Sequence, residues 1–177
     1  MTMGTTQVRK DDQPAGEGLG RGIDSLRDIL APGAVMSALS VPNKKSLFQQ
    51  LGQLAARQCN VDPKLVVERL GERERLGSTG FGGGIAIPHG KIDGLDRVVG
   101  IFARLSVPID FAAIDDLPVD LVFLLLSPPN SGVAHLKALA RVSRKLRDKQ
   151  FVAKLRGAGS PDALYALLTN GNALDAA

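Results

Sequence analysis

Apolar side chains recur at helical spacing in two stretches of the first half of the chain. A favourable N-cap, Asn43, precedes the first stretch. Its apolar stripe consists of Leu47, Phe48, Leu51, Leu54 and Ala55. Asp62 followed by Pro63 starts the second stretch, with a cap and a proline at the first helical position. We therefore expect two amphipathic helices before residue 76.

Four further helices are predicted from the same kind of pattern. One or two helical turns are expected over residues 23–30, and longer helices over 131–147, 148–157 and 160–170. In the helix that follows Ser131, the core stripe is Leu139, Val142 and Leu146. His135 lies on the same side of that helix, so the second histidine of the chain is expected to face inward.

Near-continuous apolar runs predict the strands. Residues 97–105 and 119–126 are too hydrophobic for surface strands and should be central, while 34–41 is a third candidate and 108–116 a loop or short edge piece. The apolar residues 85–87 predict a short strand that ends at His89. Pro88 supports this boundary because proline lacks a backbone donor and holds the preceding residue extended.

Length and composition suit one α/β domain with two tails. We expect the domain over residues 23–170, a disordered tail over 1–22 and a short tail over 171–177. Hydrophobic residues make up 44% of the chain and aromatic residues only 4%, which argues against a stacking surface for single-stranded nucleic acid. The net charge of +4 does not favour nucleic acid either. Residues 131–157 alone hold eight basic residues and one acid, so the charge is one patch.

The expected compartment is the cytoplasm. The lone Cys59 excludes an intramolecular disulfide and fits a reducing environment. No basic-then-apolar signal opens the chain, and the longest aliphatic run, Leu121 to Leu126, is too short to cross a bilayer. We therefore expect no membrane insertion.

The stretch from Leu76 to Lys91 carries the candidate chemistry. It places six glycines, two hydroxyls, a histidine and a lysine in sixteen positions. Glycine at this density costs backbone entropy and adds nothing to a core, so a close approach of the backbone to something else is the better explanation.

Several kinds of site do not fit this stretch. A P-loop needs four residues between its glycines and a hydroxyl after its lysine, whereas five residues separate Gly84 from Gly90 and Ile92 follows the lysine. The dinucleotide pattern lacks its third glycine, which Ile85 replaces. Two histidines and one cysteine do not make a structural zinc site, and no nucleophile elbow occurs. No metal, nucleotide or cofactor is expected.

Histidine acting as a nucleophile fits better. A neutral imidazole attacks phosphorus and then hands the phosphoryl group on, in a transfer that depends on positioning and charge neutralisation. Arg73 and a phosphate-binding loop could serve His89 in this way. The loop would consist of Ser78, Thr79, Gly82, Gly83 and Gly84. The alternative is that both histidines are buried structural residues.

A family resemblance accompanies these residues. Arg73-Glu-Arg-Leu-Gly-Ser-Thr-Gly, followed by Gly-Ile-Ala-Ile-Pro-His89-Gly-Lys, resembles the active-site signature of the IIA components of the bacterial phosphoenolpyruvate-dependent phosphotransferase system, in the fructose/mannitol and nitrogen-regulatory class. The segment from Pro108 to Leu126 and the run Ala134-His135-Leu136-Lys137 are similar to later parts of that family. Phe81 and Gly83 depart from it, since an aliphatic and a small polar residue are expected there.

The resemblance implies a mixed sheet flanked by helices and a phosphotransferase relay. It implies that His89 is phosphorylated by an HPr-like carrier, that His135 orients the phosphoryl group or the imidazole, and that Arg73 neutralises charge. With no IIB or membrane segment attached, the nitrogen-regulatory branch is favoured, whose members contact sensor kinases or potassium transport systems. A sugar-specific IIA that passes phosphate to a IIB domain and a non-catalytic binding module on the same fold stay open.

Overall fold

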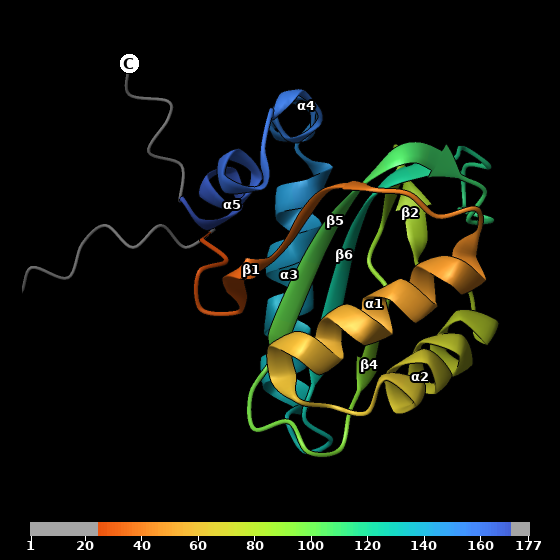
Figure 1. Cartoon of the computed structure of the whole chain (residues 1–177), viewed down its shortest axis with the longest axis vertical. Helices are drawn as coiled ribbons and strands as arrows, with labels where there is room; N and C mark the ends of the chain where they lie inside the picture. Colours follow the sequence, from red (N-terminus) through yellow and green to blue (C-terminus); the bar gives the residue numbers. More distant parts are fainter. Residues whose placement is uncertain (1–24, 171–177) are drawn as a thin grey trace, which may run out of the picture.

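A computed structural model describes residues 25–170 of the chain (Figure 1). The predicted tails over 1–22 and 171–177 lie outside the described residues. Within these residues the chain forms one six-stranded sheet and five helices. The strands are β1 (Leu30–Leu39), β2 (Gly80–Gly82), β3 (Ile85–Ala86), β4 (His89–Lys91), β5 (Val99–Ile109) and β6 (Val119–Ser127). The helices are α1 (Lys44–Cys59), α2 (Pro63–Arg75), α3 (Gly132–Arg147), α4 (Lys149–Gly157) and α5 (Pro161–Thr169).

The sheet is mixed, with the strand order β1-β5-β6-β3-β2. β1 runs parallel to β5, and β5 runs antiparallel to β6. β3 and β4 both pair with β6 in the parallel direction, one after the other along its length. Figure 1 shows α1 and α2 on one side of the sheet and α3 on the other. The predicted mixed sheet flanked by helices is therefore confirmed.

The two strands at the centre are buried as their composition predicts. Phe102 of β5 and Phe123 of β6 are fully buried, with ring centroids 6.4 Å apart. Every residue of β6 except Asp120 is buried. A strand covered on both faces has no polar side to present, which explains its continuous apolar run. β6 is thus the rigid element on which β3 and β4 are placed.

Side-chain caps begin most of the predicted helices. Asn43 accepts a hydrogen bond from the amide of Ser46 at the start of α1, and Asp62 accepts one from Lys64 at the start of α2. Asp148 and Ser160 cap α4 and α5 in the same way. Ser131 precedes α3 without such a bond. Its hydroxyl donates to the carbonyl of Pro128 instead.

Two local predictions were wrong. The described residues before Leu30 form a turn rather than a helix, and β1 begins there and includes Pro32. Proline is tolerated because β1 is an edge strand with one neighbour, β5. The predicted strand before His89 is split: β3 ends at Ala86 and β4 begins at His89. Pro88 interrupts the ladder, so His89 opens a strand instead of ending one.

Candidate active site

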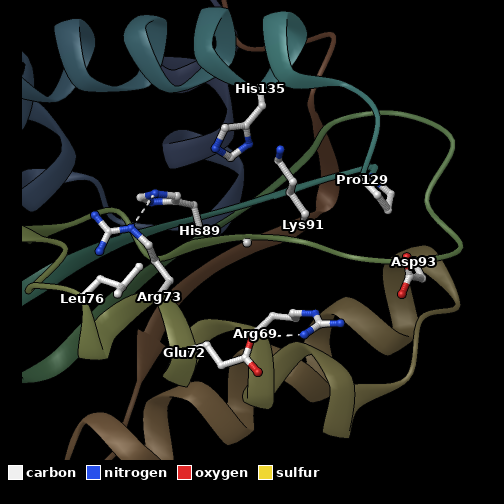
Figure 2. Close-up of a pocket in the computed structure, with 10 residues that line it drawn as sticks. Arg69, Glu72, Arg73, Leu76, His89, Lys91, Asp93, Pro129 and His135 are labelled. Carbon is white, nitrogen blue, oxygen red and sulfur yellow. Dashed lines mark hydrogen bonds and ion pairs between the residues drawn. The ribbon is translucent and has the colours of Figure 1, made fainter.

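A cleft of about 440 Å³ lies where α2 ends, β4 passes and α3 begins (Figure 2). The residues that line it are Arg69, Glu72, Arg73, Leu76, His89, Gly90, Lys91, Asp93, Pro129 and His135. It brings together the three residues that the sequence singled out as catalytic, which come from three separate segments of the chain. Figure 2 shows both imidazoles, the Arg73 guanidinium and the Lys91 amine directed into this space.

His89 is held by the break in its own strand. Ile87 lies between β3 and β4, so its carbonyl is available to the His89 ring, and Nδ1 of His89 is 2.8 Å from that oxygen. A carbonyl oxygen only accepts hydrogen bonds, so Nδ1 carries the proton. Nε2 therefore presents its lone pair. The chain fixes the imidazole in the form that a nucleophile needs.

Arg73 supplies the cation beside that lone pair. It lies in the last turn of α2, and its Nε donates to Nε2 of His89 over 3.1 Å. A second nitrogen of the guanidinium donates to the carbonyl of Gly77 at 2.9 Å. The guanidinium is thus anchored to the loop after α2 while one of its edges faces the imidazole.

A residue that sequence reasoning missed anchors this end of α2. The Glu74 carboxylate accepts hydrogen bonds from the amide and the hydroxyl of Thr79, and from the Lys44 amine at 3.0 Å. Its side chain is only 9% exposed. Alternating charges at the end of a helix, as in residues 72–75, usually form a solvated face. One sequence signal could have identified this anchor: a carboxylate that is adjacent to Arg73 and five residues before a threonine.

His135 faces His89 across the cleft. It lies one turn into α3, is buried as predicted, and its ring centroid is 5.5 Å from that of His89. Nδ1 of His135 is 2.6 Å from the hydroxyl oxygen of Ser127, the last residue of β6. Ser127 is a second residue that sequence reasoning missed.

The surroundings of both imidazoles favour the neutral form. Burial lowers the pKa of His89, and the charge of Arg73 lowers it further, although the Ile87 carbonyl and Glu74 oppose this shift. Burial also lowers the pKa of His135, with further contributions from His89 and Lys91. A neutral nucleophile and a cationic surrounding are the two conditions for accepting a phosphoryl group.

The structure does not bring the predicted phosphate-binding loop to this cleft. The Gly84 carbonyl accepts a hydrogen bond from the amide of Asp120, whereas His89 pairs with Leu125 of the same strand. At strand spacing these two positions on β6 are about 16 Å apart. The Gly83 amide donates to Asp115. Gly82, Gly83 and Gly84 all have positive φ. Gly82 is the last residue of β2, and Gly83 and Gly84 form the turn to β3.

The two hydroxyls of the loop are also engaged elsewhere. Ser78 donates to the carbonyl of Phe111, and the Thr79 hydroxyl donates to Glu74. Phosphate binding by these five residues gains no support from the geometry. Of the polar side chains that line the cleft, Arg73 contacts Nε2 of His89, and the His135 ring faces the His89 ring.

Residues 25–170 contain no group of three or more histidine, cysteine, aspartate or glutamate side chains placed to hold a metal ion. Among the same residues, no helix has the length and apolar character needed to span a membrane.

Known proteins show the same combination of sequence and fold. Residues 28–171 match the family model for the phosphoenolpyruvate-dependent sugar phosphotransferase system, EIIA 2. A nitrogen regulatory protein from Bradyrhizobium diazoefficiens is 48% identical over 143 residues, which cover 81% of this chain and 94% of that protein. A fructose-specific EIIA component from Haloferax volcanii is 36% identical over 126 residues, 71% of this chain and 82% of that protein.

A solved structure matches along the same region. The crystal structure of the nitrogen regulatory protein IIA-Ntr from Neisseria meningitidis superposes with a TM-score of 0.76 at 37% sequence identity. The match covers 80% of this chain and 97% of that one. The architecture described above is therefore that of the IIA proteins in this class.

Proposed function

We propose that this chain, which belongs to the EIIA 2 family of the phosphoenolpyruvate-dependent sugar phosphotransferase system, accepts a phosphoryl group on Nε2 of His89 and passes it on. The observation that carries the proposal is the state of that nitrogen. The proton of the ring is on Nδ1, where it is hydrogen-bonded to the Ile87 carbonyl, so Nε2 has a free lone pair. Nε of Arg73 lies 3.1 Å from Nε2.

The transfer step requires only residues of the cleft and the donor. The Nε2 lone pair attacks the phosphorus of a phosphohistidine on an HPr-like carrier, and the P–N bond of the donor breaks with its electron pair returning to the donor ring. Nδ1 of His89 keeps its proton, which remains hydrogen-bonded to the Ile87 carbonyl. The phosphorylated ring therefore becomes positively charged and is a good leaving group for the next transfer. The Arg73 guanidinium turns from Nε2 to the phosphoryl oxygens.

A protein donor fits the surroundings of the cleft. Leu76, which follows α2 and lines the cleft, is an exposed large apolar side chain. Val133 and Leu136 are also exposed and lie close to His135 in the sequence, in the first turns of α3. Exposed apolar groups around a polar centre are typical of a protein contact surface. The proposed exchange would take place in the cytoplasm, and it needs no metal or nucleotide.

The nitrogen-regulatory branch is the role we propose. The support is the greater identity to a nitrogen regulatory protein, 48%, than to a fructose-specific EIIA component, 36%. In this role the phosphorylation state of His89 would govern contacts with sensor kinases or potassium transport systems. A sugar-specific role is the second candidate, which the fructose-specific relative supports.

The experiment that tests the proposal is intact-mass measurement after incubation with phosphoenolpyruvate and the donor proteins. We expect the wild-type chain to gain one phosphoryl group and His89→Ala to gain none. His135→Ala is the matched control, because it removes the other imidazole of the cleft and should slow labelling without abolishing it. Full labelling of His89→Ala would refute the proposal.

A second measurement separates the two roles. The labelled protein is mixed with a fructose-type IIB domain, and the loss of phosphate is followed with time. Slow loss supports the regulatory role, and rapid loss supports the sugar-specific one. A binding module without phosphotransfer would retain partner control in His89→Ala.

A further inference from the structure

Ser127 lies directly beneath the cleft. It is the last residue of β6, it is fully buried, and the β4–β6 register places it opposite Lys91. Its carbonyl accepts a hydrogen bond from the amide of Ile92, so the backbone at this point is fixed on the side of β4. Its hydroxyl points the other way, to α3, and reaches Nδ1 of His135 at 2.6 Å.

The hydrogen-bond partners available to Ser127 decide which atom donates in its contact with His135. Among residues 25–170, Nδ1 of His135 is the one partner within reach of the Ser127 hydroxyl. If that hydroxyl accepted a proton from Nδ1, its own proton would be buried with no acceptor. Buried donors without partners are rare because they lose their bond to water and gain nothing. The Ser127 hydroxyl therefore donates, and Nδ1 of His135 accepts.

The two imidazoles then carry complementary tautomers. A neutral imidazole has one proton, so an accepting Nδ1 leaves that proton on Nε2 of His135. His89 has the reverse arrangement, with its proton on Nδ1 and its lone pair on Nε2. One ring of the facing pair is prepared as an electron-pair donor, and the other as a hydrogen-bond donor.

We propose that Ser127 is a positioning residue that holds His135 as the Nε2–H tautomer, so that this N–H is aimed at the phosphoryl group on His89. The aim toward phosphate rests on the proposed function, whereas the tautomer itself does not. Without Ser127, the His135 ring could carry its proton on either nitrogen and would present a lone pair to the phosphoryl oxygens part of the time. A lone pair facing phosphate oxygens is repulsive.

The groups around His135 are compatible with this assignment. Burial disfavours a positive charge on its ring and so lowers its pKa, and His89 and Lys91 of β4 act in the same direction. The ring also lies in the first turns of α3, where the helix dipole favours the neutral form. The tautomer rather than the protonation state is therefore what Ser127 controls in the unphosphorylated protein.

The test uses the full chain labelled with ¹⁵N in its histidines, studied by NMR at about pH 7.5, where neutral imidazole dominates. We expect wild-type His135 to carry its proton on Nε2, with Nδ1 in the unprotonated state. In Ser127→Ala the two nitrogen resonances of His135 should move toward each other as the tautomers mix. Ser127→Thr keeps the hydroxyl on a side chain suited to a strand and should retain the single tautomer.

Ser131→Ala is the matched control. It removes another serine hydroxyl near the start of α3, but that hydroxyl binds the carbonyl of Pro128 and not His135. We expect it to leave the tautomer of His135 and the rate of His89 phosphorylation unchanged. Ser127→Ala should lower that rate about tenfold, the size expected for one lost hydrogen bond in the transition state.

Two results would overturn the inference. One is a wild-type His135 protonated on Nδ1, and the other is a Ser127→Ala variant in which both the tautomer and the rate are unchanged. The tautomer is measured before any phosphate is present. A failure of His89 labelling would therefore refute the proposed function and leave the assignment of the His135 tautomer unaffected. Normal labelling of His89 together with a His135 protonated on Nδ1 would refute the role of Ser127 and leave the proposed function standing.

Discussion

The Nε atom of Arg73 lies 3.1 Å from Nε2 of His89 and donates a hydrogen bond to it. A permanent cation therefore occupies the position next to the lone pair before any phosphate arrives. On the other side of the ring, Nδ1 is 2.8 Å from the Ile87 carbonyl and is closed to an incoming phosphorus atom. This asymmetry determines where phosphate is expected to attach.

We expect the phosphoryl group on Nε2 of His89 and none on Nδ1. The reason is that Nδ1 carries a proton and is covered by Ile87, while Nε2 is open to the cleft. Phosphorus–nitrogen coupling in NMR spectra of the phosphorylated, ¹⁵N-histidine-labelled protein identifies the nitrogen directly. Coupling to Nδ1 would mean that the ring turns over before transfer and that the Ile87 contact is lost.

Arg73→Lys should slow phosphorylation of His89 by about tenfold to a hundredfold. The reason is that the lysine ammonium is a point charge, whereas the planar guanidinium can donate two parallel hydrogen bonds to phosphate oxygens. Rapid-mixing measurement of label uptake gives the rate. Arg75→Lys is the control: it lies on the same helix end, is exposed, and does not line the cleft. Equal rates in the two variants would show that Arg73 has no part in transfer.

The acid limit of the reaction should lie below the usual range for histidine. Burial lowers the pKa of His89 from the ordinary value of 6.5, and Arg73 adds to this effect. His89 should therefore keep its lone pair at pH values where a free imidazole is already protonated. NMR titration of the His89 ring should give a midpoint below 6.5, and the acid limb of the phosphorylation rate should shift in the same direction. A midpoint above 6.5 would contradict this prediction.

The same shifts have a consequence for stability. His89 and His135 both have lowered pKa values in the folded protein, so below about pH 6.5 the unfolded chain binds protons that the folded protein does not. The free energy of unfolding should therefore fall as the pH falls through 6.5, and this contribution should level off below the folded pKa values. Urea unfolding from pH 8 to 5 measures it. A His89→Gln, His135→Gln double variant should show a shallower dependence over that range.

Glu74→Ala should lower the free energy of unfolding by about 2 kcal/mol, because it leaves the buried amide of Thr79 without an acceptor. Glu72→Ala is the matched control on the same helix. Its carboxylate is 45% exposed and pairs with Arg69 at the surface, so its removal should change stability by no more than about 0.5 kcal/mol. Urea denaturation gives both values, and equal losses would show that the Glu74 contacts add nothing.

Gly84→Ala tests the role of the glycine turn. An added Cβ would lie 2.5 Å from the Arg156 guanidinium and 2.9 Å from Asp120, at a φ of +80°, so we expect a loss of roughly 2 kcal/mol in stability. Gly94→Ala is the control, since its φ is also positive but the added Cβ meets nothing within 4 Å. It should lose roughly 1 kcal/mol, from backbone strain alone.

The labelling result is the second half of this test. A folded Gly84→Ala protein should still accept phosphate on His89, because the turn does not line the cleft. Lost labelling with unchanged stability would instead assign the turn to phosphate binding, as the sequence predicted.

Much of the fold follows from local physics. Asn43 and Asp62 cap the helices they were predicted to cap, and the apolar run at residues 119–126 is the buried central strand. These features depend on neighbours in the chain, through capping, helical spacing and the absence of polar side chains. The family resemblance similarly located Arg73, His89 and His135, which the fold brings into one cleft.

Other features depended on contacts between distant segments. Glu74 lies in a run of alternating charges typical of a solvated face, yet its side chain is nearly buried and bonds Lys44 and Thr79. The glycines were assigned to phosphate, yet the register of β3 on β6 places their turn at the far end of the strand from His89.

The sequence by itself determined most of the helices, which strands are buried and which imidazole is the nucleophile candidate, because these features follow from the residue types and their spacing. Only the tertiary structure decided which nitrogen of His89 is open and what holds His135. Both answers depend on hydrogen bonds to Ile87 and Ser127, whose directions are set by the break between β3 and β4 and by the meeting of β6 with α3. Spacing along the chain carries no information about such directions, since the geometry exists only once the strands have paired.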